Sequence, residues 1–296
     1  MKTSLNRALI VAAIVAATTY GAGYGQQKQS ANGEYAEVNG LKMYYEIHGS
    51  GQPLVLLHGA FGFVEGWGAM LPTLTKTHQV IAIELQGHGH TNDLDRPLTY
   101  EQMAEDTAAL LNQLKIRNAD VFGYSLGGTV ALGVAIRHPE LVRKLAIYGS
   151  TAGMMKETYD PETYKQFLSL PADFAPPPLK EPYDRMAPDP KRWPVLVTKI
   201  KGLERNFKGY SATEVKAIKA QTLIMTGDRD VVRPEHAVEM YRLIPSAQLA
   251  IFPGADHFML LSSPDKFLAT LAHFLASPMP APKKSPKKSP KKSEDE

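Results

Sequence analysis

The chain has 296 residues, of which 44% are hydrophobic and 21% are charged, a balance that excludes a disordered chain and a multispanning membrane protein. It contains no cysteine, which excludes disulfides, thiolate catalysis, iron–sulfur clusters and zinc sites built on cysteine. The formal net charge of +3 lies at the two ends, because the first 25 residues contribute +2 and the segment from residue 278 onward contributes +3. Residues 26–277 therefore carry a net charge of −2.

The first 25 residues have the layout of a secretory signal peptide. Lys2 and Arg7 give a positive start, residues 8–17 are apolar, and small residues follow up to Gly25. Cleavage after Gly25 would start the mature chain at Gln26 and place it in the periplasm or outside the cell. The alternative is an uncleaved membrane anchor, which the sequence favours less because a spanning helix needs about 20 apolar residues.

Residues 278–296 form a low-complexity segment rich in proline, lysine and serine. This composition cannot form a packed core, so it predicts a disordered, solvated basic tail. The repeated Ser-Pro-Lys-Lys is similar to the DNA-binding tails of linker histones. An exported protein would not meet chromosomal DNA, so we expect no nucleic-acid partner and instead non-specific contact with anionic surfaces.

Short apolar runs and helical patterns alternate between the two ends. An Asn39-Gly40 hairpin comes first. Runs that are apolar on both faces predict buried strands of a parallel sheet, at residues 53–59, 78–84, 120–123, 144–148, 222–227 and 248–252. Helical patterns lie between them, one with a capping box at Thr99 and Gln102, and the others at residues 127–138, 234–243 and 264–275. The alternation predicts an α/β fold with right-handed crossovers.

One segment interrupts this alternation. Residues 154–219 separate two predicted strands and are too many for a loop without structure of its own. The segment is rich in proline and in large apolar side chains. We expect a helical cap insertion over the ends of the strands, within one catalytic domain that spans residues 26–277.

The motif with the most chemical content is Gly123-Tyr-Ser125-Leu-Gly127. It follows a predicted strand and precedes a predicted helix, which is the context of a nucleophile elbow. A serine on such a sharp turn exposes its hydroxyl, and glycine two residues to either side lets the strand and the helix approach closely. The helix N-terminus can then present backbone N–H groups to an oxyanion.

A nucleophilic serine needs a base, and the base needs an acid that orients it. Among nine histidines, His257 directly follows the last predicted strand. Asp228 and Asp230 follow the preceding strand. All of these positions lie at the carboxyl ends of strands, where open α/β sheets build their sites.

In these motifs the chain resembles the α/β-hydrolase superfamily, over about residues 34–276. The resemblance implies a mostly parallel twisted sheet flanked by helices, with Asp230 rather than Asp228 as the acid. It also implies an oxyanion hole formed by the backbone N–H groups of Ala60 and Leu126, with Ala60 in the motif His58-Gly59-Ala60. We expect a structural role for the His58 side chain, and turn roles for Asp228 and for Asp256.

The segment after the predicted strand at residues 78–84 departs from the family pattern at one position and could also form a different kind of site. Gln86 stands where arginine is common in the family. His88 and His90, with Asp93 and Asp95, could form a metal cluster, but the spacing fits known metal sites poorly. The remaining histidines lack a motif and are expected at the surface or at helix ends: His48, His78, His138, His236 and His273.

A serine nucleophile predicts acyl transfer to Ser125 and then to water, with no cofactor or metal. The substrate would be a small molecule, and the apolar, methionine- and aromatic-rich insertion favours a largely apolar carboxylic ester. Alternatives are a C–C bond hydrolase or enol-lactonase of aromatic catabolism, and a non-catalytic binding protein on the same fold. No sequence feature points to a particular oligomeric state.

Overall fold

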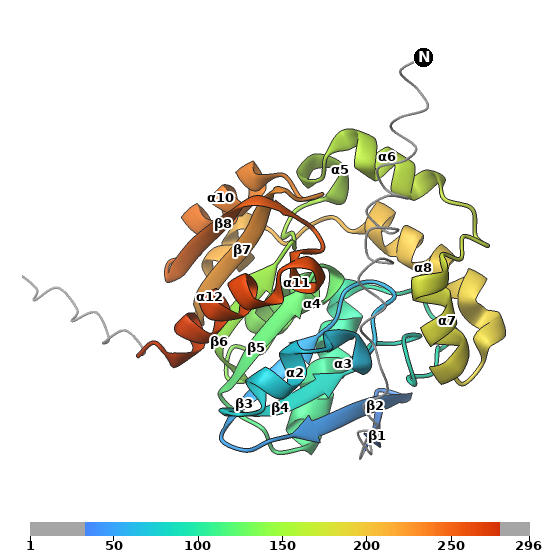
Figure 1. Cartoon of the computed structure of the whole chain (residues 1–296), viewed down its shortest axis with the longest axis horizontal. Coiled ribbons are helices and arrows are strands. Elements are labelled where there is room, and N and C mark those ends of the chain that lie inside the picture. Colours follow the sequence, from blue (N-terminus) through green and yellow to red (C-terminus); the bar gives the residue numbers. More distant parts are fainter. Residues whose placement is uncertain (1–32, 279–296) are drawn as a thin grey trace, which may run out of the picture.

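The computed structural model describes residues 33–278, so the predicted signal segment and nearly all of the predicted tail lie outside the described residues. The described part forms a sheet of eight strands in the order β1-β2-β4-β3-β5-β6-β7-β8 (Figure 1). β1 and β2 join antiparallel, β2 pairs antiparallel with β4, and all other neighbours are parallel. The strands are β1 (Gly33–Val38), β2 (Leu41–His48), β3 (Gln52–Leu57), β4 (His78–Ile83), β5 (Ala119–Tyr124), β6 (Val142–Tyr148), β7 (Gln221–Arg229) and β8 (Ala247–Asp256).

The six predicted apolar runs are the strands β3 to β8, and the α/β fold class is confirmed. The prediction that every run is buried on both faces is wrong for β8. This strand closes one edge of the sheet, pairs only with β7, and leaves Ile251 39% exposed. An edge position gives a strand one neighbour rather than two, so its side chains are covered less.

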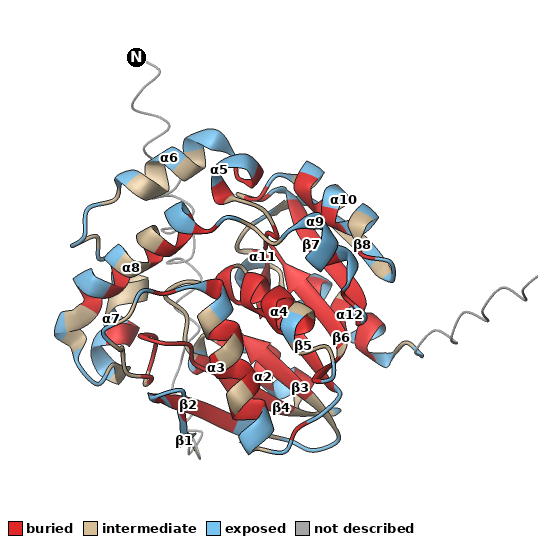
Figure 2. Ribbon diagram, turned by 180° about the vertical axis from the view of Figure 1, so that it is seen from behind, coloured by how far each residue is buried: buried red, intermediate tan, exposed pale blue. Residues whose placement is uncertain are grey.

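Helices cover both faces of the sheet and create two separate cores. Along β3, Val55 and Leu57 point into one core, while Leu54 and Leu56 point into the other. The first core includes α3 (Tyr100–Gln113), α4 (Leu126–Arg137) and α10 (Pro234–Leu243); the second includes α2 (Met70–Leu74), α11 (Met259–Ser262) and α12 (Pro264–Ala276), with the short turn η2 (Val64–Trp67). Figure 2 shows the strands buried between these layers.

Local turn and cap signals behave largely as expected. Asn39 and Gly40 both have positive φ, 50° and 78°, as the tight hairpin between β1 and β2 requires. Thr99 caps α3 by accepting a hydrogen bond from the Gln102 backbone N–H at 3.1 Å. The predicted capping box is only half formed, because the Gln102 side chain donates to Asp106 instead.

The segment between β6 and β7 is helical. It contains α5 (Met155–Thr158), α6 (Pro161–Ser169), α7 (Pro177–Met186), the short turn η3 (Pro190–Arg192), α8 (Trp193–Asn206) and α9 (Ala212–Lys216). In Figure 1, α5 to α8 lie together along the upper and right-hand side of the molecule. The outer surfaces of α6 and α7 are largely exposed, whereas α8 presents a buried apolar stripe to the first core (Figure 2). We call α5 to α9 the inserted helices.

Asp93, in the loop after β4, joins the inserted helices to the body. Its carboxylate accepts hydrogen bonds from Arg192 of η3 at 2.5 Å and from Lys199 of α8 at 2.7 and 2.9 Å. Burial alone would raise the pKa of Asp93, but the hydrogen bonds from Arg192, Lys199 and Gln86 outweigh burial and hold that pKa below its ordinary value. The carboxylate is therefore a charged link between two parts of the fold.

A buried lysine fixes the end of α12. Lys144 lies in the amino-terminal half of β6 and is fully buried. Its ammonium group donates to the carbonyl oxygens of Phe274, Leu275 and Ser277 at 2.8, 2.7 and 2.6 Å. Phe274 and Leu275 lie in the last turn of α12, and Ser277 is the residue directly after the helix, so the lysine caps the helix C-terminus. Among residues 33–278, no helix has both the length and the apolar character needed to cross a membrane.

Candidate active site

Three strand ends bring Ser125, Asp230 and His257 together. Ser125 directly follows β5, Asp230 follows β7, and His257 follows β8. The Ser125 Oγ lies 2.9 Å from Nε2 of His257, and Nδ1 of His257 lies 2.7 Å from Oδ1 of Asp230. The three predicted side chains thus form a continuous hydrogen-bonded chain from hydroxyl to carboxylate.

The backbone at Ser125 is held in a conformation that L-residues rarely adopt, with φ 53° and ψ −121°. Its N–H donates to the carbonyl of Tyr148 on the neighbouring strand at 2.9 Å. The flanking glycines allow the strand and helix to meet: a Cβ on Gly123 would lie 2.4 Å from the Gly127 carbonyl oxygen, and one on Gly127 would lie 2.2 Å from that of Leu57. These contacts give the physical reason for the glycine positions of the motif.

The carboxylate of Asp230 is completely buried. Its Oδ1 also accepts the backbone N–H of Val232 at 3.1 Å, while Oδ2 has no hydrogen-bond partner among the described residues. Gly149 packs directly beside the pair, because a Cβ there would lie 2.8 Å from the His257 ring and 2.9 Å from Asp230 Oδ2. Any larger residue at position 149 would displace the histidine or the carboxylate.

The environment of His257 favours its charged form. Burial lowers the pKa of the ring, but the charge of Asp230 and the hydrogen bond to it, together with the charge of Glu204, outweigh burial and raise the pKa above its ordinary value. The backbone around the ring is also fixed. The hydroxyl of Tyr124 donates to the His257 carbonyl at 2.9 Å, and that of Tyr148 donates to the carbonyl of Asp256 at 2.5 Å.

The two other acids near the triad hold turns. Asp228 accepts the Gly254 backbone N–H at 2.8 Å, which joins the ends of β7 and β8. Asp256 accepts the N–H of Phe258 at 2.9 Å within the loop that carries His257. Neither side chain is hydrogen-bonded to His257, whose Nδ1 is occupied by Asp230.

The loop after β3 lies against Ser125. A Cβ on Gly59 would stand 3.2 Å from the Cβ of Ser125, so Ala60 follows a residue in close contact with the elbow. Leu126 is the first residue of α4, and the first N–H groups of a helix have no partner within it. Both backbone positions suit the predicted oxyanion donors.

The buried histidines near this loop have structural contacts. His58 is held neutral between the Gly59 carbonyl, to which Nδ1 donates at 2.8 Å, and the Leu85 N–H, which donates to Nε2 at 3.1 Å. Burial and the neighbouring His88 lower the pKa of His58 to about 3. Burial also lowers the pKa of His88 to about 4. His236, expected at the surface or a helix end, lies near the start of α10 but is buried, and its Nε2 accepts the N–H of Ala152 at 3.2 Å.

The rival metal cluster is not assembled. His88 donates to the Gln86 carbonyl at 3.0 Å, His90 contacts Glu84, Asp93 binds Arg192 and Lys199, and Asp95 is exposed. Gln86 itself bridges Asp93 and Arg96, at 2.9 and 2.6 Å. Within residues 33–278, the group close enough to share an ion is instead Glu65, Glu84 and His90. Glu84 there already accepts the backbone N–H groups of Val64 and His90, which accounts for its burial.

The comparison with known proteins agrees with this fold. Residues 54–270 match the model of the alpha/beta hydrolase family, and the chain belongs to that family. It is 26% identical over 270 residues to 2-hydroxymuconate semialdehyde hydrolase of Pseudomonas sp. (strain CF600), covering 80% of this chain and 91% of the relative. It is also 26% identical over 272 residues to pimeloyl-[acyl-carrier protein] methyl ester esterase of Nitrosospira multiformis, covering 79% and 98%.

Among solved structures, a putative lipase from Acinetobacter baumannii AYE superimposes with a TM-score of 0.69 at 25% identity, over 83% of this chain and 91% of that chain. The two relatives described above are named as hydrolases of different compounds, a semialdehyde and a methyl ester. The protein is therefore an alpha/beta hydrolase enzyme, and its particular substrate has to be argued from the site.

Sequence reasoning missed one buried acid near the site. Glu204, in α8, is 7% exposed and close enough to His257 for each charge to affect the other's pKa. A signal was present: Glu204 lies four residues after Ile200 and seven after Val197, on the stripe that α8 buries. An acid on an apolar stripe is the pattern that would have identified it.

Proposed function

We propose that this protein is a serine hydrolase that forms an acyl-enzyme on a small, largely apolar carboxylic ester. The observation that carries the proposal is the hydrogen-bonded chain from Ser125 through His257 to the buried Asp230. An exposed surface serine has no such base, and a purely structural triad would not require the strained backbone at Ser125.

The chemistry follows from the atoms in contact. Nε2 of His257 accepts the hydroxyl proton as Ser125 Oγ attacks the ester carbonyl carbon, and the carbonyl oxygen becomes an oxyanion. The intermediate collapses, the C–O bond to the alcohol breaks, and His257 returns its proton to the departing alcohol. Water then attacks the acyl-serine with His257 again as base, releasing the acid and restoring Ser125.

Two features support the rest of the assignment. The backbone N–H groups of Ala60 and Leu126 are the donors for the oxyanion, and donors of this kind are worth roughly 3 kcal/mol each in transition-state stabilisation. Phe61, which directly follows Ala60, packs against the first core, and its ring lies 5.2 Å from the ring of Trp193 of α8. They favour an apolar acyl or alcohol group.

A second candidate reaction is hydrolysis of a C–C bond beside a carbonyl. The similarity to 2-hydroxymuconate semialdehyde hydrolase favours it, since the same residues would serve. The two reactions are separated by a substrate panel of short-chain esters, lactones and diketones assayed on the same purified enzyme. Ester turnover well above diketone turnover supports the first proposal, and the reverse ranking supports the second.

The decisive test of the mechanism is Ser125→Ala. We expect at least about a 10⁴-fold loss of ester turnover with an unchanged fold, because triad residues act as a unit. Labelling by a fluorophosphonate probe should disappear in the same variant. The matched control is Ser169→Ala, an exposed serine on α6, which should retain both turnover and labelling. Turnover near the original level in Ser125→Ala would overturn the proposal.

A further inference from the structure

The burial of the Glu204 carboxyl is not explained by the hydrogen bonds of Ser125, His257 and Asp230. Glu204 sits on the apolar stripe of α8, and its Oε2 has no hydrogen-bond partner among the described residues. Burial raises the pKa of Glu204 to about 7, with the charge of His257 opposing that rise. Leaving a buried polar atom without a partner costs roughly 1–3 kcal/mol, so such an atom usually has a water or ligand partner.

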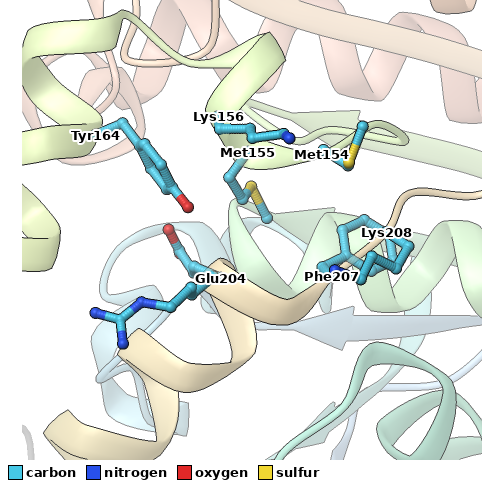
Figure 3. Close-up of a pocket in the computed structure, with 8 residues that line it drawn as sticks. Met154, Met155, Lys156, Tyr164, Glu204, Phe207 and Lys208 are labelled. Carbon is cyan, nitrogen blue, oxygen red and sulfur yellow. The ribbon is translucent and has the colours of Figure 1, made fainter.

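The carboxyl group faces a small cavity. The cavity has a volume of about 60 Å³, and Met155, Phe207 and Tyr164 are among its lining residues. Figure 3 shows the hydroxyl of Tyr164 and the carboxyl of Glu204 pointing toward one another from α6 and α8. The Oε2 atom of Glu204 accepts no hydrogen bond from Tyr164 or from any other described residue. The space between a carboxyl and a phenol can therefore hold one further polar group.

The charges around the cavity limit which ligand group could bind between Glu204 and Tyr164. Lys156, Arg205 and Lys208 also line it and are exposed, so they surround its opening with positive charge and disfavour an ammonium group. The carboxyl of Glu204 disfavours a second carboxylate. A neutral hydroxyl fits both partners, because it can donate its proton to Glu204 while its oxygen accepts the proton of Tyr164.

The cavity also lies near the reacting groups. The helix α5, which lines the cavity, is followed by Tyr159, which pairs with Val232, and by Asp160, whose backbone N–H donates to the Val231 carbonyl at 2.9 Å, so this part of the insertion is joined to the segment directly after Asp230. The subsite proposed below requires that a substrate bound at Ser125 extends from its reacting carbonyl toward Glu204. The inserted helices supply both polar side chains, while the body supplies the nucleophile and base.

We propose that Glu204 and Tyr164 form a specificity subsite that binds a hydroxyl group on the part of the substrate beneath the inserted helices. The proposal rests on the ester hydrolase function proposed above and adds the substrate class to it: hydroxylated rather than plain aliphatic esters. The two side chains select the substrate, and they take no part in the proton transfers of the triad.

The test compares matched esters on the purified full chain. One pair is methyl hexanoate and methyl 3-hydroxyhexanoate, which differ in the acyl group. The other is hexyl acetate and 6-hydroxyhexyl acetate, which differ in the alcohol. We expect kcat/KM of the original protein to favour the hydroxylated ester of at least one pair by about tenfold, the effect of one good hydrogen bond.

Variants then assign that preference to the subsite. Glu204→Leu should bring the ratio close to one, Glu204→Gln should keep part of it, and Tyr164→Phe should lower it. Glu162→Gln, an exposed acid on α6, is the control and should leave the ratio unchanged. If Glu204→Leu does not fold, Tyr164→Phe decides the question.

Two results would overturn the proposal while leaving the hydrolase function standing. One is equal kcat/KM for the plain and hydroxylated esters of both pairs in the original protein. The other is a preference that survives in both Glu204→Leu and Tyr164→Phe. Failure of the original protein to hydrolyse any ester is a different outcome, which would contradict the proposed function itself.

Discussion

Ser125, the proposed nucleophile, is one of five non-glycine residues with positive φ among residues 33–278. A non-glycine residue at φ 53° and ψ −121° costs on the order of 1–3 kcal/mol, and neighbouring structure has to maintain it. At Ser125 that support comes from its hydrogen bond to the Tyr148 carbonyl and from glycines at positions where a Cβ would overlap the backbone. The turn orients the hydroxyl toward His257 before any substrate arrives.

Two aspartates two residues apart make the assignment of the acid testable. Asp230→Asn should lower kcat/KM of an activated aryl ester by about 10⁴-fold, because it removes the charge that orients and stabilises His257. Asp228→Asn should cost far less, since an asparagine oxygen can still accept the Gly254 N–H. Steady-state kinetics of the two variants checks the ranking, and a larger loss in Asp228→Asn would show that Asp228 is the orienting acid.

The raised pKa of Glu204 predicts a stability effect with a defined sign. Its pKa rises from an ordinary value of 4.5 to about 7 on folding, so the folded state binds the proton more tightly. The contribution of the protonated Glu204 carboxyl to the free energy of unfolding is fully present below pH 4.5 and is lost as the pH rises through 7. Glu204→Gln has no carboxyl to ionise, so it avoids this loss. The free energy of unfolding of the variant minus that of the original protein should therefore be larger at pH 8 than at pH 4.5, by at most about 3 kcal/mol.

Thermal unfolding of both proteins at the two pH values measures that difference. The ionisable groups near Glu204 are the same in each: His257, Tyr100, Tyr159, Tyr164 and the cations that line the cavity. The tyrosines have pKa values raised by burial and stay neutral over this range. A stability difference between the two proteins that does not change with pH would contradict the burial of a titrating carboxyl.

At the scale of elements, periodicity and glycine motifs predicted the sheet and the triad. Residues 54–57 of β3 and 145–148 of β6 are apolar runs followed by turn residues, so the sequence indicated these strands locally. Ser125 and His257 could be placed because strand ends in a parallel sheet share one edge. Choosing Asp230 over Asp228 needed the family resemblance, since both follow the same strand.

The inserted helices could not be placed in the same way. α6 buries no residue fully, and α7 contains Pro182, which is disfavoured inside a helix, so neither burial nor helix propensity indicates where these helices pack. Their positions depend on contacts with distant segments, such as the Trp193 indole N–H that donates to the Phe174 carbonyl at 2.7 Å. The subsite around Glu204 exists only after those contacts form, which is why the sequence alone did not reveal it.

The charged link at Asp93 should hold the inserted helices to the body. Asp93→Asn leaves the Lys199 ammonium and Arg192 guanidinium without their anion, and breaking a buried pair costs roughly 3–5 kcal/mol. We expect the lower part of that range, because Arg192 is 39% exposed. The control is Asp95→Asn, an exposed acid in the same loop. Differential scanning calorimetry measures both, and equal melting temperatures for the two variants would contradict the link.

Across the whole molecule, the side chains of the candidate active site and the end of α12 lie at opposite ends of the parallel strands. Ser125, Asp230 and His257 follow the carboxyl ends of their strands, while Lys144 near the amino end of β6 binds the last turn of α12. Removing residues 279–296 should therefore leave both kcat/KM and the melting temperature unchanged. This segment begins after the last carbonyl that Lys144 binds, at Ser277.

A deeper truncation supplies the contrast. A chain ending at His273 loses the three carbonyl partners of the buried Lys144 ammonium, and its melting temperature should fall markedly. Unfolding curves and ester kinetics for both shortened chains check the prediction. A large loss of kcat/KM on removing residues 279–296 alone would show that they act on the site.

The position of the α12 cap formed by Lys144 also bears on how the enzyme can be attached to a support. Residue 278 follows Ser277, whose carbonyl binds Lys144 near the amino end of β6. A bead, a carrier protein or an anionic surface joined through the carboxyl terminus would therefore lie at the amino ends of the strands, away from Ser125. The Ser125 hydroxyl would then face the bulk solution, with the inserted helices free to admit substrate. Attachment through the lysines that line the opening of the Glu204 cavity, Lys156 or Lys208, would instead place that opening against the support.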